Sequence, residues 1–279
     1  MPIISFWNAT REQTGQTLSA IATVTNMAIQ QNIKILLIST SLNDNTMKDC
    51  FSVEKQGMLS SIFGSNINVV NQNGIEGLDR IVRSNKISPN IVKDYTKVIL
   101  KERLEVLFGY TGTEGQYDDL CKQYLEIIMA ANQYYNLVFV DVAREMDKAL
   151  QKEILKRSDI IVPIISQKKE TIKQSINYFV KAPDVDIKKA IFTIGKYDGK
   201  SKYNIKNITR NIAKEKNTIN ISNTISYNTL LADASQEGGI VDLLLDFSRL
   251  KGKDENTELI RELTELGNEI KMKINQIGK

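Results

Sequence analysis

Two parts of the sequence carry residue types at spacings that could bind a phosphate group and a metal ion. Residues 3–27 read as an apolar strand, a polar loop that holds Gly15, and a helix that starts near Thr17. The first turn of a helix leaves backbone N–H groups unpaired, so a strand that enters a helix through such a loop predicts a phosphate site. Asp141 ends a second apolar run, at residues 135–141, where a carboxylate can hold a Mg²⁺ ion through its water shell or simply terminate a strand.

The polar loop departs from the phosphate-binding pattern G-x-x-x-x-G-K-[ST]. It keeps Gly15 and Thr17, but Gln16 stands where the pattern has a lysine. We therefore expect the backbone N–H groups of the loop to make most of the contacts to a bound phosphate. The residues predicted to bind the ligand here are Thr14, Gly15, Gln16, Thr17, Leu18 and Asp141, with Thr17 and Asp141 beside the metal.

Composition excludes several kinds of chemistry. The sequence has no histidine, which removes histidine-based triads, histidine general bases and histidine metal sites. Its two cysteines, Cys50 and Cys121, have no metal-ligand spacing, and we expect both to be reduced. Any chemistry must come from carboxylates, hydroxyls, lysines, arginines and a bound ion.

Length and hydropathy predict one large α/β domain. The 279 residues are 42% hydrophobic and 25% charged, as in an ordinary soluble globular protein. No apolar run approaches the roughly 18 to 20 residues needed to cross a bilayer, and the first residues read as a core strand rather than a signal peptide. We expect a cytoplasmic protein.

Alternating apolar runs and helical patterns predict a mostly parallel sheet flanked by helices, which is a doubly wound α/β fold. Strands are expected at residues 32–39, 104–108, 135–141, 159–165 and 189–194, and helices at residues 116–133, 169–180 and 203–216. A helical insertion is predicted at residues 74–102, where Ser88 reads as an N-cap with Pro89 at the first helical position. The simplest role for the insertion is a helical layer that covers the sheet.

The sequence divides into a domain at residues 1–252 and an amphipathic helix at residues 253–279. Apolar residues recur in this last segment at helical spacing, with acids early and lysines late, which complements the helix dipole. Its polar face is acidic as far as Ile270, unlike that of a typical membrane-surface helix. We expect it to pack on the domain or on a partner chain.

The helix predicted at residues 203–216 carries a row of cations. Lys206, Arg210 and Lys214 repeat every four residues, Lys202 lies just before them, and no aromatic residue interleaves the row. Such a row could follow a nucleic-acid backbone, in which case binding would be electrostatic and would weaken with salt. A formal net charge of +4 permits an anionic partner without requiring one, and a solvated helix face is the alternative interpretation.

The polar loop resembles that of the MinD/ParA group of P-loop ATPases, which reads K-G-G-x-G-K-T. Arg11 falls at the first, signature lysine of that loop, and Gln16 falls at the second. A more specific resemblance is to the TadZ/CpaE-like branch of Gram-positive bacteria, whose loops have the form F-W-S-P-x-x-G-Q-T-G-T-T. The residues that match this form are Phe6, Trp7, Gln13, Thr14, Gly15 and Thr17.

Three later segments extend the resemblance to essentially residues 3–277. They are the insertion, which is similar to I-x-x-L-x-R-x-V-x-S-x-K-[LI]-[TS]-P; IFTIGKYDGKSKYNIKNI, which is similar to V-L-N-[RK]-Y-D-x-[RK]-S-K-Y; and ISYNTLLAD, which is similar to I-P-Y-N-x-x-L-x-x-A. CpaE and TadZ carry a receiver-like domain before the P-loop, whereas this sequence starts at the P-loop strand. The resemblance implies a P-loop fold of the MinD/ParA type with a degenerate Walker A loop and no receiver domain.

The resemblance also identifies four losses at positions that contact the nucleotide. One is Gln16. Ser39 stands where the family has the second-strand aspartate that helps to place the attacking water, and Gly195 stands where it has the asparagine that reads adenine. Ser226 stands where the family has a proline after the last strand. It implies weak binding of ATP and Mg²⁺ with little or no hydrolysis, and we assign no catalytic residue. Arg11 is expected to contact the nucleotide, and at the signature position it could do so across a homodimer interface.

Three functions are open at this point. The first is a nucleotide-binding positioning factor or scaffold for a pilus, secretion or conjugation apparatus or for a plasmid. The second is an active partition ATPase that binds DNA without sequence preference. The third is a scaffold that binds no nucleotide.

Overall fold

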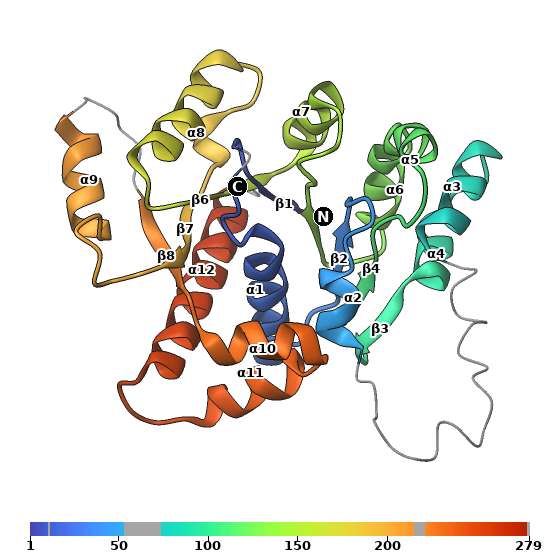
Figure 1. Ribbon diagram of the computed structural model, residues 1–279. Coiled ribbons are helices and arrows are strands. Elements are labelled where there is room, and N and C mark those ends of the chain that lie inside the picture. The colour runs from blue at the N-terminus through green and yellow to red at the C-terminus, as the bar shows by residue number, and fades with distance from the viewer. Residues whose placement is uncertain (11, 53–73, 215–220, 278–279) are drawn as a thin grey trace.

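The computed structural model describes residues 1–10, 12–52, 74–214 and 221–277, and these residues form a sheet covered by helices on both faces (Figure 1). The strand order is β3-β4-β2-β5-β1-β6-β7-β8. All neighbouring strands are parallel except β3 and β4, which pair antiparallel at one edge. This arrangement confirms the predicted doubly wound α/β fold.

The strands are β1 (Ile3–Trp7), β2 (Ile35–Ser39), β3 (Lys97–Leu100), β4 (Leu104–Leu107), β5 (Leu137–Asp141), β6 (Ile160–Ile165), β7 (Phe192–Tyr197) and β8 (Ile221–Ser226). The α-helices are α1 (Gln16–Gln30), α2 (Thr46–Phe51), α3 (Ile75–Arg83), α4 (Pro89–Val92), α5 (Glu114–Cys121), α6 (Tyr124–Ala131), α7 (Lys148–Arg157), α8 (Lys169–Lys181), α9 (Ile205–Lys214), α10 (Thr229–Glu237), α11 (Ile240–Arg249) and α12 (Glu255–Ile277). Two 3₁₀ turns, at Lys93–Tyr95 and Ile187–Lys189, complete the described elements.

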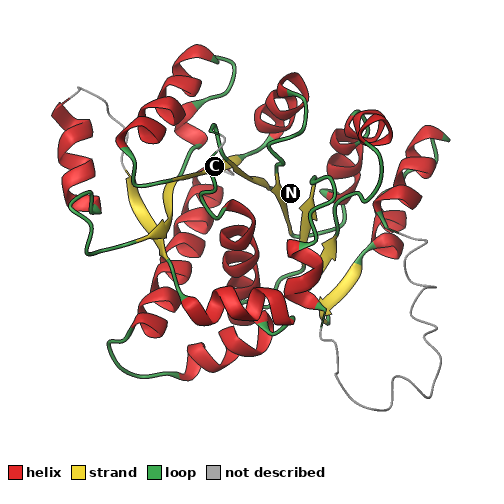
Figure 2. Ribbon diagram, in the orientation of Figure 1, coloured by secondary structure: helices red, strands yellow, loops and turns green. Residues whose placement is uncertain are grey.

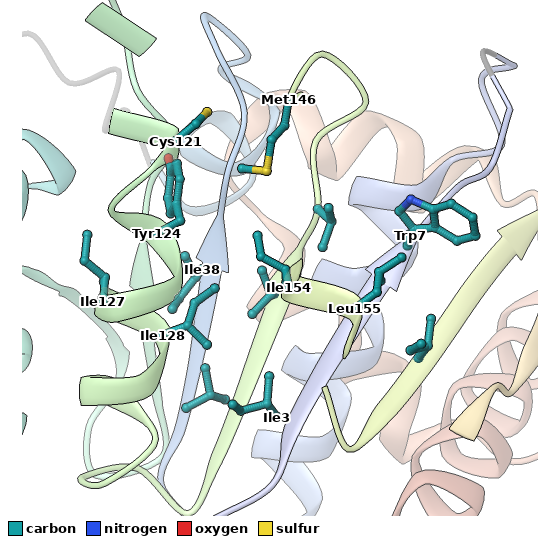
Figure 3. Close-up of a cluster of buried hydrophobic side chains, with 14 of the residues drawn as sticks. Ile3, Trp7, Ile38, Cys121, Tyr124, Ile127, Ile128, Met146, Ile154 and Leu155 are labelled. Carbon is teal, nitrogen blue, oxygen red and sulfur yellow. The ribbon is translucent and has the colours of Figure 1, made fainter. Parts of the chain in front are cut away.

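The central strands separate two apolar layers, because alternate side chains of a strand point to opposite faces of the sheet. In β1, Ile3 and Trp7 join the layer beneath α3 to α9, whereas Ile4 and Phe6 join the layer beneath α1, α2 and α10 to α12. Figure 2 shows these helices on the two sides of the sheet, and Figure 3 shows side chains of the first layer converging from β1, β2, α6 and α7. Burial on both faces explains why these strands read as continuous apolar runs.

The insertion differs from the helical layer that its sequence predicts. Helices α3 and α4 form as expected, and Pro89 opens α4, but residues 97–100 are strand β3 instead of helix. Val98 and Ile99 are β-branched residues that favour a strand, and a tight turn with Glu102 at φ 61° brings β3 back against β4. The predicted helix at residues 116–133 is likewise two helices, α5 and α6. The residues between them include no glycine or proline, so the helical spacing of apolar residues continues across the break and the sequence gives no sign of it.

Helix α12 packs on the domain itself, against α1, α11 and β8. Its apolar residues Leu259, Leu263 and Leu266 are fully buried. The buried Glu262 carboxylate on α12 accepts hydrogen bonds from the backbone N–H of Ser226 at 2.7 Å and from the Ser226 hydroxyl at 3.0 Å. Proline has no N–H to donate, so the serine at this position lets β8 bind α12. Within the residues that the structure describes, no helix is both long and apolar enough to cross a bilayer.

Candidate functional site

The candidate site lies at the carboxyl ends of β1, β2 and β5. Parallel pairing places Asp141, the last residue of β5, between Phe6 of β1 and Ser39 of β2. The loop after β1 therefore starts beside Asp141 and returns to the sheet edge where α1 begins. In an open α/β sheet this edge is where ligands bind.

The described residues of the loop after β1, 8–10 and 12–15, are held in shape by their own polar side chains. The Asn8 amide donates to the Glu12 carbonyl at 2.9 Å and to the Thr14 hydroxyl at 3.2 Å, and its oxygen accepts from the Thr10 N–H at 2.9 Å. The Thr14 N–H donates to the Glu12 carbonyl at 3.0 Å. These bonds preorganise the loop, and nothing in the sequence patterns had marked Asn8 for this role.

Gly15 joins the loop to α1 in the left-handed backbone region, with φ 78° and ψ 24°. Glycine adopts this conformation without the steric cost that a side chain brings. Gly15 brings no side chain to cap α1, and no described side chain accepts from the N–H groups of its first turn, which lines the cleft next to the loop. This is the backbone arrangement that binds an anion at a helix N-terminus.

Gln16 does not occupy the place of a phosphate-binding lysine. Its amide nitrogen donates inward, to an Asp141 carboxylate oxygen at 2.7 Å and to the Val142 carbonyl at 2.9 Å, and its side chain is 9% exposed. The Thr17 hydroxyl donates to the other Asp141 oxygen at 2.8 Å. Gln16, Thr17 and Asp141 thus form one polar group, although 124 positions separate Thr17 from Asp141 in the sequence.

Asp141 is a buried carboxylate, 3% exposed. Burial raises the pKa of Asp141 to about 6, and the hydrogen bonds from Gln16 and Thr17 lower it only in part. The carboxylates of Asp44 and Glu145 raise the pKa further. A buried carboxylate with this pKa would be stabilised in its charged form by a cation.

A cleft of about 320 Å³ opens above this polar group. The residues that line it are Asn8, Glu12, Gln13, Thr14, Gly15, Gln16, Thr17, Leu18, Ser41, Asp44, Thr46, Asp141, Ala143, Arg144, Glu145 and Lys196. Ser39, at the tip of β2, is buried and bonded to Ser41, but Asp44 brings a carboxylate from the same loop to the cleft wall. An acid therefore lies near the tip of β2, although Ser39 itself is not one.

The donor set suits a magnesium ion that also binds phosphate. The Thr17 hydroxyl and the Asp141 carboxylate are the hard oxygen donors that Mg²⁺ prefers, and they would hold the ion or its water shell. Among the described residues, no group of three acidic or thiol side chains could hold a metal by itself. Phosphate oxygens would have to complete the coordination, which is the usual way in which Mg²⁺ binds with a nucleotide. Gln16 carries a buried amide oxygen that no described donor satisfies.

Arg11 lies outside the described residues. Of the predicted cation row, Lys202, Lys206 and Arg210 are exposed on or beside α9, which packs at the β8 edge of the sheet, and the side chain of Lys214 is outside the described part. None of these three residues lines the cleft. An exposed Tyr203 ring lies 5.2 Å from the Lys202 ammonium, so an aromatic side chain does flank the first cation. The expectation of a row free of aromatic residues was wrong at this end.

The sequence interpretation missed Lys196, which lines the cleft from the end of β7. A signal was present, because Lys196 matches the [RK] position of the V-L-N-[RK]-Y-D motif. Its neighbour Gly195 had counted only as a lost asparagine. Their proximity to the loop at residues 8–15 depends on the order of β1, β6 and β7 in the sheet, which local patterns do not reveal.

The sequence matches no protein-family model and no curated protein. The fold is similar to several solved structures. A ParA family ATPase from Chlorobium tepidum has a TM-score of 0.68 at 12% identity, with 95% of this chain and 98% of that chain covered. A putative plasmid partition protein from Borrelia burgdorferi, bound to AMPPNP, has a TM-score of 0.59 at 18% identity, with 98% of each chain covered.

The septum site-determining protein MinD from Pyrococcus horikoshii, complexed with Mg-ADP, has a TM-score of 0.63 at 12% identity, with 96% of this chain and 95% of that chain covered. These likenesses show that the chain has the fold of ParA- and MinD-type P-loop ATPases. At identities this low they do not transfer an activity.

Proposed function

We propose that this protein is an atypical ParA/MinD-like positioning factor or scaffold that binds ATP with Mg²⁺, forms a homodimer and hydrolyses little or no ATP. The observation that carries the proposal is the position of Gln16. Its side chain turns inward to Asp141, while the left-handed Gly15, the free first turn of α1 and the Thr17–Asp141 pair are all present. Elements that bind a nucleotide are retained, and the charge that lowers the barrier to phosphoryl transfer is missing from position 16.

Affinity should be modest. A charge-assisted contact to phosphate contributes roughly 1.5 to 3 kcal/mol, so the loss of one weakens binding by about one to two orders of magnitude. ATP at millimolar concentration would still occupy such a site. The resemblance to the TadZ/CpaE-like branch supports a role beside a protein machine, such as a pilus, secretion, conjugation or partition apparatus.

Thermal unfolding in the presence of ATP and Mg²⁺ tests nucleotide binding. We expect the midpoint to rise by a few degrees at millimolar ATP, because a ligand that binds the folded state stabilises it. Thr17→Ala should abolish the rise, since it removes the hydroxyl next to Asp141. The matched control is Thr25→Ala, on the same helix, whose buried hydroxyl has no described partner.

Three outcomes separate the functions. A rise that Thr17→Ala abolishes and Thr25→Ala keeps supports the proposal, and sedimentation should then show dimers that form with ATP. Absence of any rise at millimolar ATP would favour a scaffold without nucleotide. A rise together with steady ATP turnover would favour an active partition ATPase.

A second candidate function is binding to DNA without sequence preference. It rests on Lys202, Lys206 and Arg210, which are exposed together and form no ion pair with any residue in the described ranges. Unpaired cations on one helix can neutralise backbone phosphates. The two functions are compatible, because α9 and the cleft are different surfaces.

A further inference from the structure

Lys196 is the next-to-last residue of β7, and its conformation turns its side chain toward the P-loop. Its backbone has φ 49°, in the left-handed region that non-glycine residues rarely adopt. The register of β7 and β8 also shifts between Gly195 and Tyr197, as it does at a β-bulge. Bulges near sites commonly redirect one side chain, at a conformational cost that the surrounding structure must compensate.

Gly195 makes room for the P-loop against β7. A Cβ atom at this position would collide with the Thr14 carbonyl oxygen and lie 2.7 Å from Cγ2 of Ile164. The loop backbone therefore rests directly on Gly195. This close approach brings the next residue, Lys196, to the loop.

The aliphatic part of Lys196 lies across Gly15. A Cβ atom built on Gly15 would be 3.1 Å from Cγ and 3.3 Å from Cε of Lys196. Lys196 lines the cleft together with Thr14 to Leu18 and is exposed, and its ammonium forms no hydrogen bond or ion pair with any residue of the described ranges. A cation without a partner thus lies beside the backbone N–H groups that face the cleft.

The nearest acid on the loop does not compete for this cation. The Glu12 carboxylate accepts hydrogen bonds from Lys168 at 3.1 Å and from the Ser166 hydroxyl at 2.9 Å, and these contacts lower the pKa of Glu12. The charge of Glu12 is thereby balanced by Lys168, although Glu12 also lines the cleft. Gln16 stands at the lysine position of the motif, and its amide nitrogen donates a hydrogen bond to Asp141.

We propose that Lys196 takes the place of the missing P-loop lysine and binds the phosphates of ATP from the β7 side of the cleft. The inference rests on the nucleotide binding proposed above and adds the residue that supplies the positive charge. In this arrangement Gln16 keeps the Asp141 carboxylate in place, and Lys196 neutralises phosphate. A lysine can serve in this way because its ammonium acts as a point charge on a flexible stem.

Titration calorimetry with ATP and Mg²⁺ tests this inference on the full chain. Lys196→Met keeps an unbranched stem over Gly15 and removes the charge, so we expect binding to weaken about 10- to 100-fold. Lys196→Arg keeps the charge and should bind within about 3-fold of the wild type. Lys200→Met, an exposed lysine in the following turn, is the matched control and should leave affinity unchanged.

The outcomes distinguish this inference from the proposed function. Wild-type protein that binds ATP while Lys196→Met binds equally well would overturn the role of Lys196 and leave nucleotide binding intact. No binding by the wild type would overturn both. A weakened Lys196→Met with a lower unfolding midpoint in the absence of nucleotide, not restored by Lys196→Arg, would show that the stem is structural and that the charge has no part.

Discussion

At the scale of single residues, Asp141 shows how burial prepares a cation site. Its pKa of about 6 lies above the ordinary value near 4, so the folded protein binds a proton more tightly than the unfolded chain does. The stability that this proton contributes is fully present below about pH 4 and is lost as the pH rises through about 6. At neutral pH the ionised group therefore destabilises the protein until a cation binds.

Replacement of Asp141 by Asn tests this account. The amide has the same shape, and the Thr17 hydroxyl can accept from it, so we expect the variant without ligand to be about 2 kcal/mol more stable at pH 7.5. At pH 4.5 the gain should be much smaller, because Asp141 is then mostly protonated. Denaturant unfolding at both pH values measures the difference, and an equal effect at the two would contradict a raised pKa. The variant should also lose stabilisation by ATP and Mg²⁺.

Some site residues could be predicted from the sequence because their signals are local. Gly15 and Thr17 follow from the spacing within one loop, and Asp141 from the end of an apolar strand. The inward hydrogen bond of Gln16 and the contact of Lys196 with Gly15 could not, because each joins residues more than 100 positions apart. By comparison with the family motif, Gly195 reads as the loss of an asparagine that contacts the nucleotide. In the structure, the absence of a side chain at Gly195 is what lets the Thr14 backbone pack against β7.

At the scale of elements, the exposed cations of α9 allow a direct test of DNA binding. We expect binding to random duplex DNA at low salt, and we expect it to fall steeply with added salt because counterions are released. Changing Lys206, Arg210 and Lys214 together to Ala should abolish it in a mobility-shift assay.

The control for this test removes the same charge elsewhere. Lys101, Lys251 and Lys253 are exposed and distant from α9 in the chain, so their joint change to Ala should leave DNA binding intact. Binding that survives the α9 changes, or that falls equally with the control, would show that this helix is not the contact.

Element boundaries were predictable where the sequence marks them. Pro89 opens α4, and the helical pattern of residues 253–279 corresponds to α12. Strand β3 and the break between α5 and α6 were missed because they arise from pairing with β4 and from a turn without glycine or proline. The partner of Ser226 lies 36 positions away, on α12, and only the packed structure reveals it.

At the scale of the whole molecule, the fold is that of ParA- and MinD-type ATPases, and our proposal concerns how the cleft distributes its charge. Gln16, Ser39 and Gly195 depart from the MinD/ParA motifs, and the structure gives Gln16 and Gly195 alternative roles in holding Asp141 and seating the loop. Lys196 and Asp44 place charge at the cleft from other elements. On this combination rests our proposal that the protein retains nucleotide rather than turning it over.

A single-turnover experiment tests that claim most directly. The protein, in excess over radiolabelled ATP with Mg²⁺, is incubated for hours, and the bound and free nucleotides are then separated and identified. We predict that ATP is recovered bound and intact, with no more ADP than in a sample without protein. Gln16 is turned to Asp141, and Ser39 is not an acid at the position where the resembled family has the aspartate that places the attacking water. A phosphate contact from Lys196 would replace the binding charge without replacing that acid. Bound nucleotide converted to ADP within minutes, or no bound nucleotide at all, would contradict the account.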